Sequence, residues 1–468
     1  MLNTLIFLGF FACGDKSDDT ALEDTDLTDT GSDTDTDTDT DTDTDTTDSS
    51  LYAFTNADGE SSVSYSGQIF RHLLIADVKT YVGELNTRVE TEVFAPGQVE
   101  EDLLFYMDTI KDIDVSMVPH KFSTGDQVAA QVNYGDVSSG KNLFGKIAGN
   151  DSATDHVDWS TAFAGWTQAG VTSPESLVRV WIQELDAQAV NWTTLSSDTP
   201  SVYVSPDGKD YAQLLQKFLW GAIAFSQGAD DYLDDDVDGK GLLASHIPAE
   251  GKTYSGVEHA WDEGFGYFGG AQDYGTWTDE EIASNAFLDR NGDGEIDLKT
   301  EVNWAHSRNA GKRDKGSNVQ IDLTEDAWRA FWEGRKLLAD TVGTELSAAD
   351  LETLRGYRDQ ALGAWEMAIV GTVIHYINDT LQDINGEADL GDLAKHWSEA
   401  KGFALSMQFN PHSVLSDDDF VRLHDLLGQN PERTAEYVTA LIEARTLLGQ
   451  VYGVDAANLG DENGENGW

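Results

Sequence analysis

Apolar residues recur at helical spacing along most of the chain, and this pattern constrains the fold more than any other feature of the sequence. The first clear run contains Ile69, Leu73, Leu74, Val78, Tyr81, Val82 and Leu85. Residues three, four and seven positions apart share one face of an α-helix, so this run can bury a continuous apolar stripe. Alternation with a period of two, which indicates β-strands, is scarce. The sequence therefore predicts an all-α fold.

Similar patterns, broken by Gly, Pro and Asp, predict further helices. One of them opens with Ser173-Pro174-Glu175, in which the serine can cap the helix and the proline suits its first turn. The predicted helices after the first span about residues 99–112, 173–190, 209–233, 325–343, 350–384, 391–407, 416–428 and 431–452. Together they predict a helical-bundle architecture, either as one bundle or as two packed bundles.

The regions between the predicted helices define the domain organisation. Two connections, at roughly 114–172 and 234–322, are longer than ordinary loops and are therefore candidates for function. A chain of 468 residues is long enough for one large domain or two of ordinary size. We expect the helical domain to span residues 51–455, and we expect the acidic end of the chain, 456–468, to fray.

The N-terminal segment has the layout of a bacterial lipoprotein signal. Residues 1–12 form an apolar run that ends in a small residue directly before Cys13, the single cysteine of the chain. The run is too short to cross a bilayer as a stable helix. We therefore expect export, removal of residues 1–12 and lipidation of Cys13. The protein would then be anchored in the cell envelope, at the outer membrane or the cell surface.

An acidic tether is predicted to separate this anchor from the folded domain. It covers residues 13–50 and includes an Asp-Thr alternation from Asp33 to Thr46. Such a tract has no apolar residue to bury and repels itself, so it should stay extended and disordered.

The charge of the chain excludes some classes of partner. There are 85 Asp and Glu residues against 29 Lys and Arg residues, which gives a formal net charge of −56. Most of these acids lie after residue 50, so the helical domain is acidic as well. This argues against nucleic acid and against anionic membrane surfaces as partners.

A calcium-type loop is the sharpest local motif. The segment has oxygen-bearing side chains at loop positions one, three, five and nine, a glycine at six and an apolar residue at eight. The candidate calcium ligands are Asp289, Asn291, Asp293, Glu295 (through its backbone carbonyl) and Asp297. Position twelve is Thr300 instead of the usual glutamate, and Glu301 follows it. We expect a structural calcium ion that fixes the long connection around it.

Two short motifs place a histidine three residues before a carboxylate. The first is His259-Ala-Trp-Asp262-Glu263 and the second is His396-Trp-Ser-Glu399, and a Gly-Phe step follows each. On a helix each pair shares a face, and imidazole with carboxylate suits iron, zinc or manganese. The candidate metal ligands are His259, Asp262, Glu263, His396 and Glu399. The alternative is that both pairs are polar clasps between helices.

A third histidine, His375, lies on an otherwise apolar helix and could join or support such a cluster. A lone histidine on an apolar face is more often a hydrogen-bonded core residue, and this is the favoured interpretation of His375. Nucleophilic catalysis has little support, because the chain has no Gly-x-Ser-x-Gly elbow, no His-Glu-x-x-His motif and no cysteine apart from Cys13.

Several short segments together resemble an uncharacterised family of bacterial surface lipoproteins, which is described only as a domain of unknown function. The resemblance covers most of residues 51–450. It rests on Tyr52, Phe54, Val63–Gln68, Gln213, Lys217, Gly221, Ala222, His259–Phe268, Asn303, Trp304, Lys312–Asp314 and His396–Phe403. It implies a helical lipoprotein domain with no established activity.

The chain is more loosely similar to imelysin-like proteins, which are iron-regulated lipoproteins built from two helical bundles. Their Gly-x-His-x-x-Glu motif is matched only in its His-x-x-acid core. Val257 and Ala394 replace the glycine that precedes each histidine. This similarity implies metal binding or a peptidase-like activity.

The predictions combine into one hypothesis and two alternatives. We expect a membrane-tethered exported lipoprotein that binds a metal ion or a small ligand, with iron acquisition as one role and iron or zinc as the ion. The first alternative is a structural or interaction module without a metal site. The second is a relative of metallopeptidases, although its only candidate general bases are the same carboxylates.

Overall fold

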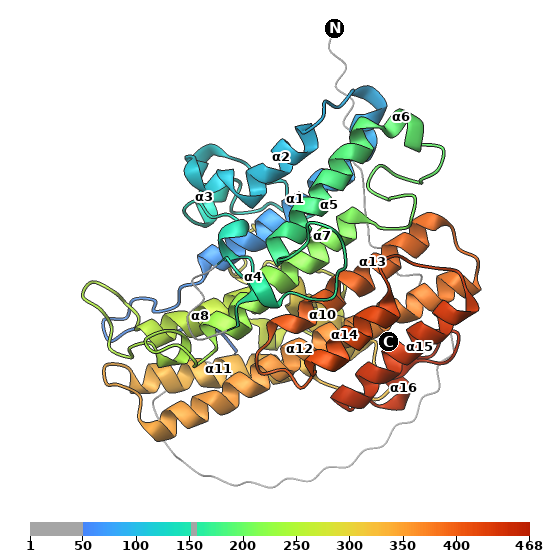
Figure 1. Cartoon of the computed structure of the whole chain (residues 1–468). Helices are drawn as coiled ribbons and strands as arrows, with labels where there is room; N and C mark the ends of the chain where they lie inside the picture. The colour runs from blue at the N-terminus through green and yellow to red at the C-terminus, as the bar shows by residue number, and fades with distance from the viewer. Residues whose placement is uncertain (1–49, 151–156) are drawn as a thin grey trace, which may run out of the picture. The chain divides into compact units, whose positions relative to one another are not determined.

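A computed structural model of the chain describes residues 50–150 and 157–468. Within these residues the regular secondary structure is helical, and extended pairing is limited to isolated β-bridges (Figure 1). The all-α prediction is therefore confirmed. The predicted signal, the lipidation position Cys13 and the Asp-Thr tract lie outside the described residues.

The long helices account for most of the fold. They are α1 (Ser66–Thr91), α2 (Gln98–Met107), α5 (Pro174–Val190), α7 (Tyr211–Leu219), α8 (Gly256–Phe268), α10 (Ala305–Lys315), α11 (Leu323–Thr341), α12 (Ala348–Asn385), α13 (Leu390–Ser406), α14 (Asp417–Leu427) and α15 (Ala435–Tyr452). Short α-helices are α3 (Tyr134–Val137), α4 (Trp159–Ala162), α6 (Trp192–Leu195), α9 (Asp279–Ala283) and α16 (Ala456–Leu459). The 3-10 turns are η1 (Thr109–Asp112), η2 (Val115–Met117), η3 (Phe144–Lys146), η6 (Gly241–Leu243), η7 (Tyr274–Thr276) and η8 (Met407–Phe409).

The helix α12 is the axis of the domain. Short connections make α11, α12 and α13 run antiparallel in sequence, and α12 packs along both of its neighbours (Figure 1). On the other side of α13 lies α7, which also contacts α1. The helix α8 packs against α1 and α11. The elements that carry the two His-x-x-acid motifs are therefore α8 and α13, and they have different neighbours.

The predicted helix at 209–233 is present, but its second half is wider than an α-helix. After α7 the chain continues through two π-helical segments, η4 (Trp220–Phe225) and η5 (Gln227–Tyr232). π-helical turns are rare and are often found near functional sites. This segment ends at the acidic run that begins with Asp234.

Side-chain caps start the helices where the sequence predicts them. The Ser173 Oγ accepts a hydrogen bond from the backbone N–H of Ser176 at 3.2 Å, and Pro174 occupies the first turn of α5. At the start of α8 the Ser255 Oγ accepts from the N–H of Glu258, whose carboxylate accepts from the N–H of Ser255 at 2.7 Å. Such caps satisfy backbone donors that a helix leaves unpaired.

Two parts of the chain are more ordered than the sequence pattern indicates. The connection predicted at 234–322 contains α8, α9 and α10, which the apolar spacing hides because α8 is rich in glycine and α10 is strongly polar. The C-terminal segment, predicted to fray, folds back on the domain. The buried Trp468 donates through Nε1 to the carbonyl of Arg313 at 3.0 Å, and its own carbonyl accepts from Asn378.

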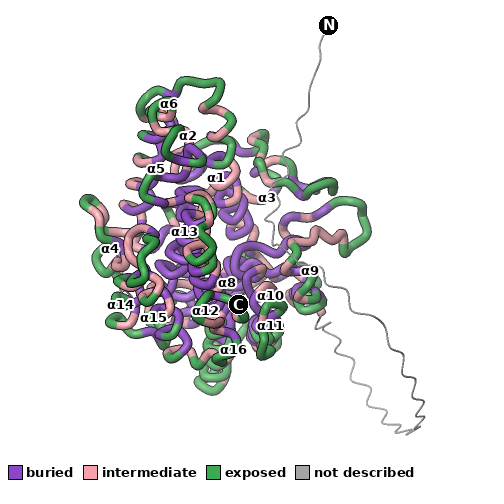
Figure 2. The backbone as a smooth tube through the Cα atoms, turned by 90° about the vertical axis from the view of Figure 1, so that its right-hand side faces the viewer, coloured by how far each residue is buried: buried purple, intermediate pink, exposed green. Residues whose placement is uncertain are grey.

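A single apolar core runs through the described residues, and its largest fully buried rings are Trp181, Trp261, Trp365 and Trp397. Buried backbone follows the middle of the long helices, while exposed residues gather in loops and at helix ends (Figure 2). The described residues from 50 onward belong to one compact unit.

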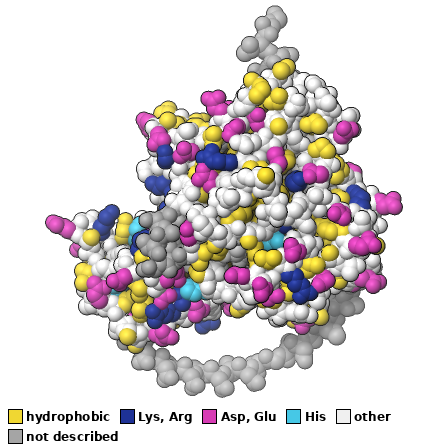
Figure 3. All heavy atoms as spheres, in the orientation of Figure 1, with side chains coloured by type: hydrophobic (Ala, Val, Ile, Leu, Met, Phe, Trp, Pro, Cys, Tyr) yellow, Lys and Arg dark blue, Asp and Glu magenta, His cyan; other side chains and the backbone are white. Residues whose placement is uncertain are grey.

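Acidic side chains are spread over the face seen in Figure 3, with Lys and Arg interspersed among them. Among the described helices, none is both long enough and apolar enough to span a membrane.

Candidate metal centre

The first motif lies on α8, where His259 and Glu263 form a partly exposed pair. The His259 Nδ1–H donates to the carbonyl of Ser64 at 3.1 Å, and the ring stacks on Tyr254 with centroids 4.6 Å apart. The other ring nitrogen, Nε2, lies 3.8 Å from Glu263 Oε2. The second oxygen of Glu263 accepts a hydrogen bond from Gln68 at 2.7 Å. The histidine thus meets the carboxylate four residues later, not the one three residues later.

Asp262 points away from His259 into the protein interior. Its Oδ1 accepts from Arg335 Nε at 2.8 Å and from the Tyr52 hydroxyl at 3.0 Å, and its Oδ2 accepts from the backbone N–H of Ser64. Burial raises the pKa of Asp262, while the guanidinium of Arg335 acts in the opposite direction. The predicted convergence of His259 and Asp262 is therefore not formed.

Arg335 on α11 ties the first motif to its surroundings. The side chain is fully buried, and its Nη1 donates to Glu258 at 2.7 Å while its Nη2 donates to Ser62. One guanidinium therefore pairs with two buried carboxylates and a backbone carbonyl. An unpaired buried charge costs several kcal/mol, so the three charged side chains depend on one another. The first motif is a clasp between α8, α11 and the segment that precedes α1.

The second motif lies on α13, where His396 faces α12. Its Nδ1–H donates to Asp383 Oδ2 at 2.7 Å, and its Nε2 lies 3.9 Å from Asp379 Oδ2. Burial acts to lower the pKa of His396, but the hydrogen bond to Asp383 and the charge of Asp379 outweigh it, and the pKa is raised. A carboxylate on one imidazole nitrogen is the usual way to fix the other nitrogen as a metal ligand.

One face of α12 supplies the matching side chains. His375, Asp379 and Asp383 are spaced four residues apart and therefore line one stripe of the helix. The His375 Nε2 lies 3.4 Å from the same Asp379 oxygen that His396 approaches. Burial lowers the pKa of His375 well below its usual value, so this imidazole is neutral. Burial raises the pKa of Asp379 to about 6, with Glu399 and Asp383 adding to the effect.

Glu399 lies close to this cluster but pairs with a cation. Its Oε1 is 3.3 Å from the Nζ of Lys217 on α7, while its Oε2 is buried and has no hydrogen-bond partner among the described residues. Burial acts to raise the pKa of Glu399, but the charges of Lys217, Lys79 and Lys395 outweigh it and the pKa is lowered. Glu399 is therefore an ionised carboxylate with one oxygen available.

The two motifs do not meet at a common centre in the described part of the chain. His259 and Glu263 bond to groups near α1, while His396 and Glu399 bond to groups on α12 and α7. Among the described residues, no set of three ligand atoms within 4.8 Å of one another includes residues of both motifs. Asp379 Oδ2 faces both His375 and His396, but these three side chains are not a set whose ligand atoms all lie within 4.8 Å of one another.

One tight set of ligand atoms exists among the described residues, and it consists of Asp234, Asp235 and His412. The Nε2 of His412 is 2.8 Å from Asp234 Oδ1. However, the guanidinium of Arg358 is 2.9 Å from Asp235 and 3.3 Å from the same His412 nitrogen, and Arg355 also pairs with Asp235. Arginine therefore occupies the position that a metal ion would need.

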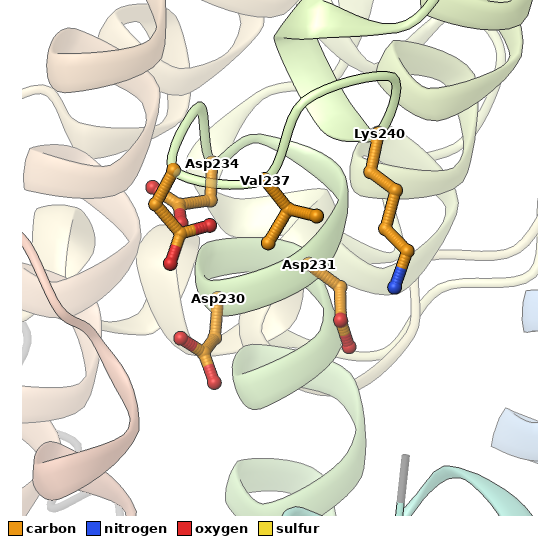
Figure 4. Close-up of a pocket in the computed structure, with 6 residues that line it drawn as sticks. Asp230, Asp231, Asp234, Val237 and Lys240 are labelled. Atoms are coloured by element: carbon orange, nitrogen blue, oxygen red, sulfur yellow. The ribbon is translucent and has the colours of Figure 1, made fainter. Parts of the chain in front are cut away.

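A hollow lies beside this set, at the end of the π-helical segment (Figure 4). Asp230, Asp231, Asp234 and Lys240 line it together with Asp236 and Val237. The indole N–H of Trp159 donates to Asp230 Oδ2 at 2.7 Å. The run that follows η5 therefore contributes Asp234, Asp236 and Val237 to the wall of a polar pocket.

The calcium-type loop is folded around its own backbone amides. The two oxygens of Asp289 accept from the N–H groups of Gly292 and Gly294 at 2.7 and 2.8 Å, and Asn291 accepts from Asp293 at 2.8 Å. Position eight, Ile296, is buried and pairs with Ala129 in a parallel β-bridge.

Glu301, which follows position twelve of this loop, is buried and points back into it. Its Oε1 accepts from the N–H groups of Arg290 and Asn291, and its Oε2 accepts from the N–H of Asp297. It thus stabilises the loop by direct hydrogen bonds.

Sequence reasoning misses most partners of the second motif. It treats His375 as a core residue, and it does not single out Asp379, Asp383 or Lys217 as site residues. The four-residue spacing of His375, Asp379 and Asp383 is a signal that could have found the α12 stripe. Nothing in the local sequence indicates that Lys217, far away in the chain, lies beside Glu399.

The fold and the cluster together define an all-α domain with a histidine–carboxylate group between two long helices. A family model described as "Domain of unknown function (DUF4856)" matches residues 49–421, and the chain belongs to this family. No curated protein and no solved structure matches the chain.

Proposed function

We propose that this domain binds one divalent transition-metal ion between α12 and α13. The ligands are His375, Asp379 and His396, with Glu399 as a further ligand. The observation that carries the proposal is the shared carboxylate: Asp379 Oδ2 lies 3.4 and 3.9 Å from the Nε2 atoms of the two histidines. Ligand atoms on a common ion with bonds of about 2.0–2.2 Å are separated by about 3–3.5 Å. The His375 spacing lies in this range, and the His396 spacing would have to shorten when an ion binds.

The chemistry of the donor set supports a transition metal over calcium at this position. Two imidazoles and a carboxylate suit iron, zinc or manganese, and two histidines with one carboxylate are the ligand set of many non-haem iron centres. The side chains of His375, Asp379 and His396 are each about one fifth to one quarter exposed, so an ion can reach them from solvent. Facing helices of a bundle are an established scaffold for such centres.

Metal content measured by mass spectrometry on the full chain, purified without chelator, tests the proposal. We expect iron, zinc or manganese near one equivalent in the wild type and a loss of that metal in His375→Ala and in His396→Ala. His259→Ala is the matched control, because it removes the same side chain from the other motif. Equal metal content in all four proteins would refute the proposal.

We propose further that the domain is held at a membrane by a lipid on Cys13, at the outer membrane or the cell surface. The support is the apolar run before Cys13 and the acidic tract after it. A tethered metal-binding domain suits capture of metal ions, iron among them, and the His-x-x-acid core of the second motif supports a relationship to imelysin-like proteins. Cys13→Ala should move the protein from the membrane fraction to the soluble fraction. Unchanged membrane association would refute the anchor.

A structural calcium ion in the loop at 289–301 is a separate proposal, supported by the order of oxygen-bearing side chains. Asp289, Asn291, Asp293 and Asp297 would provide side-chain oxygens and Glu295 its carbonyl. Calcium should raise the melting temperature of the wild type, and Asp293→Ala should abolish that increase. A melting temperature that does not respond to calcium in the wild type would refute this site.

A further inference from the structure

The candidate metal centre has a buried lysine at its inner edge. The side chain of Lys217 is about one tenth exposed, and its Nζ lies 3.3 Å from Glu399 Oε1 and 3.0 Å from Gln216 Oε1. The ammonium also lies over two aromatic rings, 4.6 Å from the centroid of Trp220 and 5.6 Å from that of Phe403. These contacts hold one oxygen of Glu399 in a defined direction.

The packing of α7 against α13 fixes the lysine stem. The two helices run in the same direction, because Asp210 at the start of α7 contacts Ser398 in the middle of α13, and Gly221 just after α7 contacts Ser406 at the end of α13. A Cβ atom on Gly402 would lie 2.8 Å from the Cβ of Lys217, so only glycine allows this approach. The Gly-Phe step after the second motif therefore has a structural cause: Gly402 admits the stem of Lys217, and Phe403 lies under its ammonium.

The other oxygen of Glu399 has no donor. Glu399 is 2% exposed, and its Oε2 is buried without a hydrogen-bond partner among the described residues. A buried acceptor left in this state costs about 1–3 kcal/mol, so such atoms call for an explanation. Because Lys217 holds Oε1, the free lone pairs are those of Oε2. Glu399 follows His396 by three residues on α13, so the two side chains share the face of this helix that lies beside Asp379.

We propose that Lys217 is a positioning residue of the metal centre. It holds Glu399 Oε1 so that Oε2 is presented to an ion bound by His396 and Asp379. This inference rests on the proposed function, but it assigns a role to a residue that does not itself bind the metal. It also explains why a lysine is kept in a core position beside a cation site: its charge balances Glu399 when the ion is absent.

Titration of the metal-free full chain with Co²⁺ tests this role, because the visible bands of Co²⁺ report its ligands while calorimetry gives Kd. We expect Lys217→Met to weaken Co²⁺ binding about 10–100-fold, the range typical of residues that orient a ligand, and to shift the visible bands. Lys315→Met is the matched control. It removes a lysine that pairs with Glu280 on the surface, and it should change neither quantity.

Glu399→Gln provides a second variant that keeps the shape of the side chain, so the test does not depend on the folding of Lys217→Met. If the lysine acts through Glu399, Glu399→Gln and the double variant Lys217→Met/Glu399→Gln should bind Co²⁺ with the same Kd. Additive losses in the double variant would overturn the inference. So would an unchanged Kd and spectrum in both Lys217→Met and Glu399→Gln while His396→Ala loses binding. Failure of His396→Ala to weaken binding would instead refute the metal centre itself.

Discussion

The motif on α8 and the motif on α13 place the same residue types at the same spacing, but their carboxylates have different partners. Asp262 is bound to Arg335, which is fully buried and also binds Glu258. Glu399 pairs with Lys217 through one oxygen, and its other oxygen has no donor in the part of the chain that the structure describes. The two carboxylates differ in how many of their oxygens are hydrogen-bonded, because both oxygens of Asp262 have partners. A buried carboxylate with both oxygens hydrogen-bonded stabilises a fold, while one with an oxygen that lacks a donor can bind a ligand.

The histidines differ in the same sense. His259 has one weakly placed acid near its free nitrogen, at 3.8 Å, and stacks on Tyr254 at the surface. His396 is oriented by Asp383 and approaches Asp379, which also faces His375. An imidazole oriented by one carboxylate and directed at another is the arrangement found around protein-bound metals. The comparison teaches that the surrounding helices, not the motif, decide which pair can bind an ion.

The largest expected effect is on stability, and it belongs to the first motif. Asp262→Asn removes the charge that faces Arg335 without changing the shape of the side chain. It should lower the free energy of unfolding by about 3–5 kcal/mol, because a buried guanidinium loses a partner. Chemical denaturation measures this. Asp379→Asn, beside the second motif, is the control, with an expected change below about 1 kcal/mol, since its carboxyl is partly exposed and no buried guanidinium depends on its charge. Equal losses of unfolding free energy in the two variants would contradict the distinction between a structural clasp and a binding site.

The two regions should also respond to acid with opposite signs. His72 on α1 donates to the carbonyl of Gly266 on α8, and burial lowers its pKa from 6.5 to about 4. Below pH 6.5 His72 binds a proton in the unfolded chain but stays neutral in the folded chain. The free energy of unfolding therefore decreases as the pH is lowered. Between about pH 7 and pH 5 this costs about 2 kcal/mol. His72→Gln should remove that part of the acid sensitivity.

His396 provides the opposite case, because its pKa is raised in the folded state. Its contribution to stability is present below the pKa of the unfolded chain and is lost as the pH rises through the folded pKa. His396→Gln should therefore destabilise the protein more at about pH 5 than at about pH 8. Unfolding curves of both variants at both pH values, without added metal, check the two signs. The same sign for both would contradict the assigned environments.

The next largest effect is on metal affinity, and it tests the second motif. Asp383→Asn keeps an acceptor for His396 but removes the charge that orients and polarises the imidazole. Metal binding should weaken about 10–100-fold, with the stoichiometry unchanged. Calorimetric titration with Zn²⁺ measures both. Gln68→Leu, which removes the partner of Glu263 in the first motif, should leave Kd unchanged.

The sequence predicts the fold class well because helix formation follows local spacing. The helices from α11 to α15 lie close to their predicted positions, since each has a regular apolar stripe and a capping residue. The helix α8 is hidden because its glycines, such as Gly264 against Leu233 and Gly266 against Tyr65, are required by close packing from distant segments. Packing of this kind has no local signal.

The candidate site is only half predictable for the same reason. His396 and Glu399 are found from their spacing. The four-residue spacing of His375, Asp379 and Asp383 would identify the stripe on α12 in the same way. The pairing of Asp262 with Arg335 and of Glu399 with Lys217 joins residues 73 and 182 positions apart, as their numbers show. No periodicity specifies such contacts, so the sequence could not separate the clasp from the site.

The smallest expected effect comes from the histidine of the first motif and completes the comparison. His259→Ala removes one hydrogen bond to the Ser64 carbonyl and a ring contact with Tyr254 from a side chain that is about one third exposed. Partly exposed contacts of this kind contribute about 0.5–1 kcal/mol, and the Ser64 carbonyl can bind water in their place. The free energy of unfolding should therefore fall by less than about 1 kcal/mol, several-fold less than for Asp262→Asn three residues away. Denaturation of both variants under the same conditions measures the ratio. A loss in His259→Ala as large as that in Asp262→Asn would mean that the histidine belongs to the buried network, and the clasp would then have to include it.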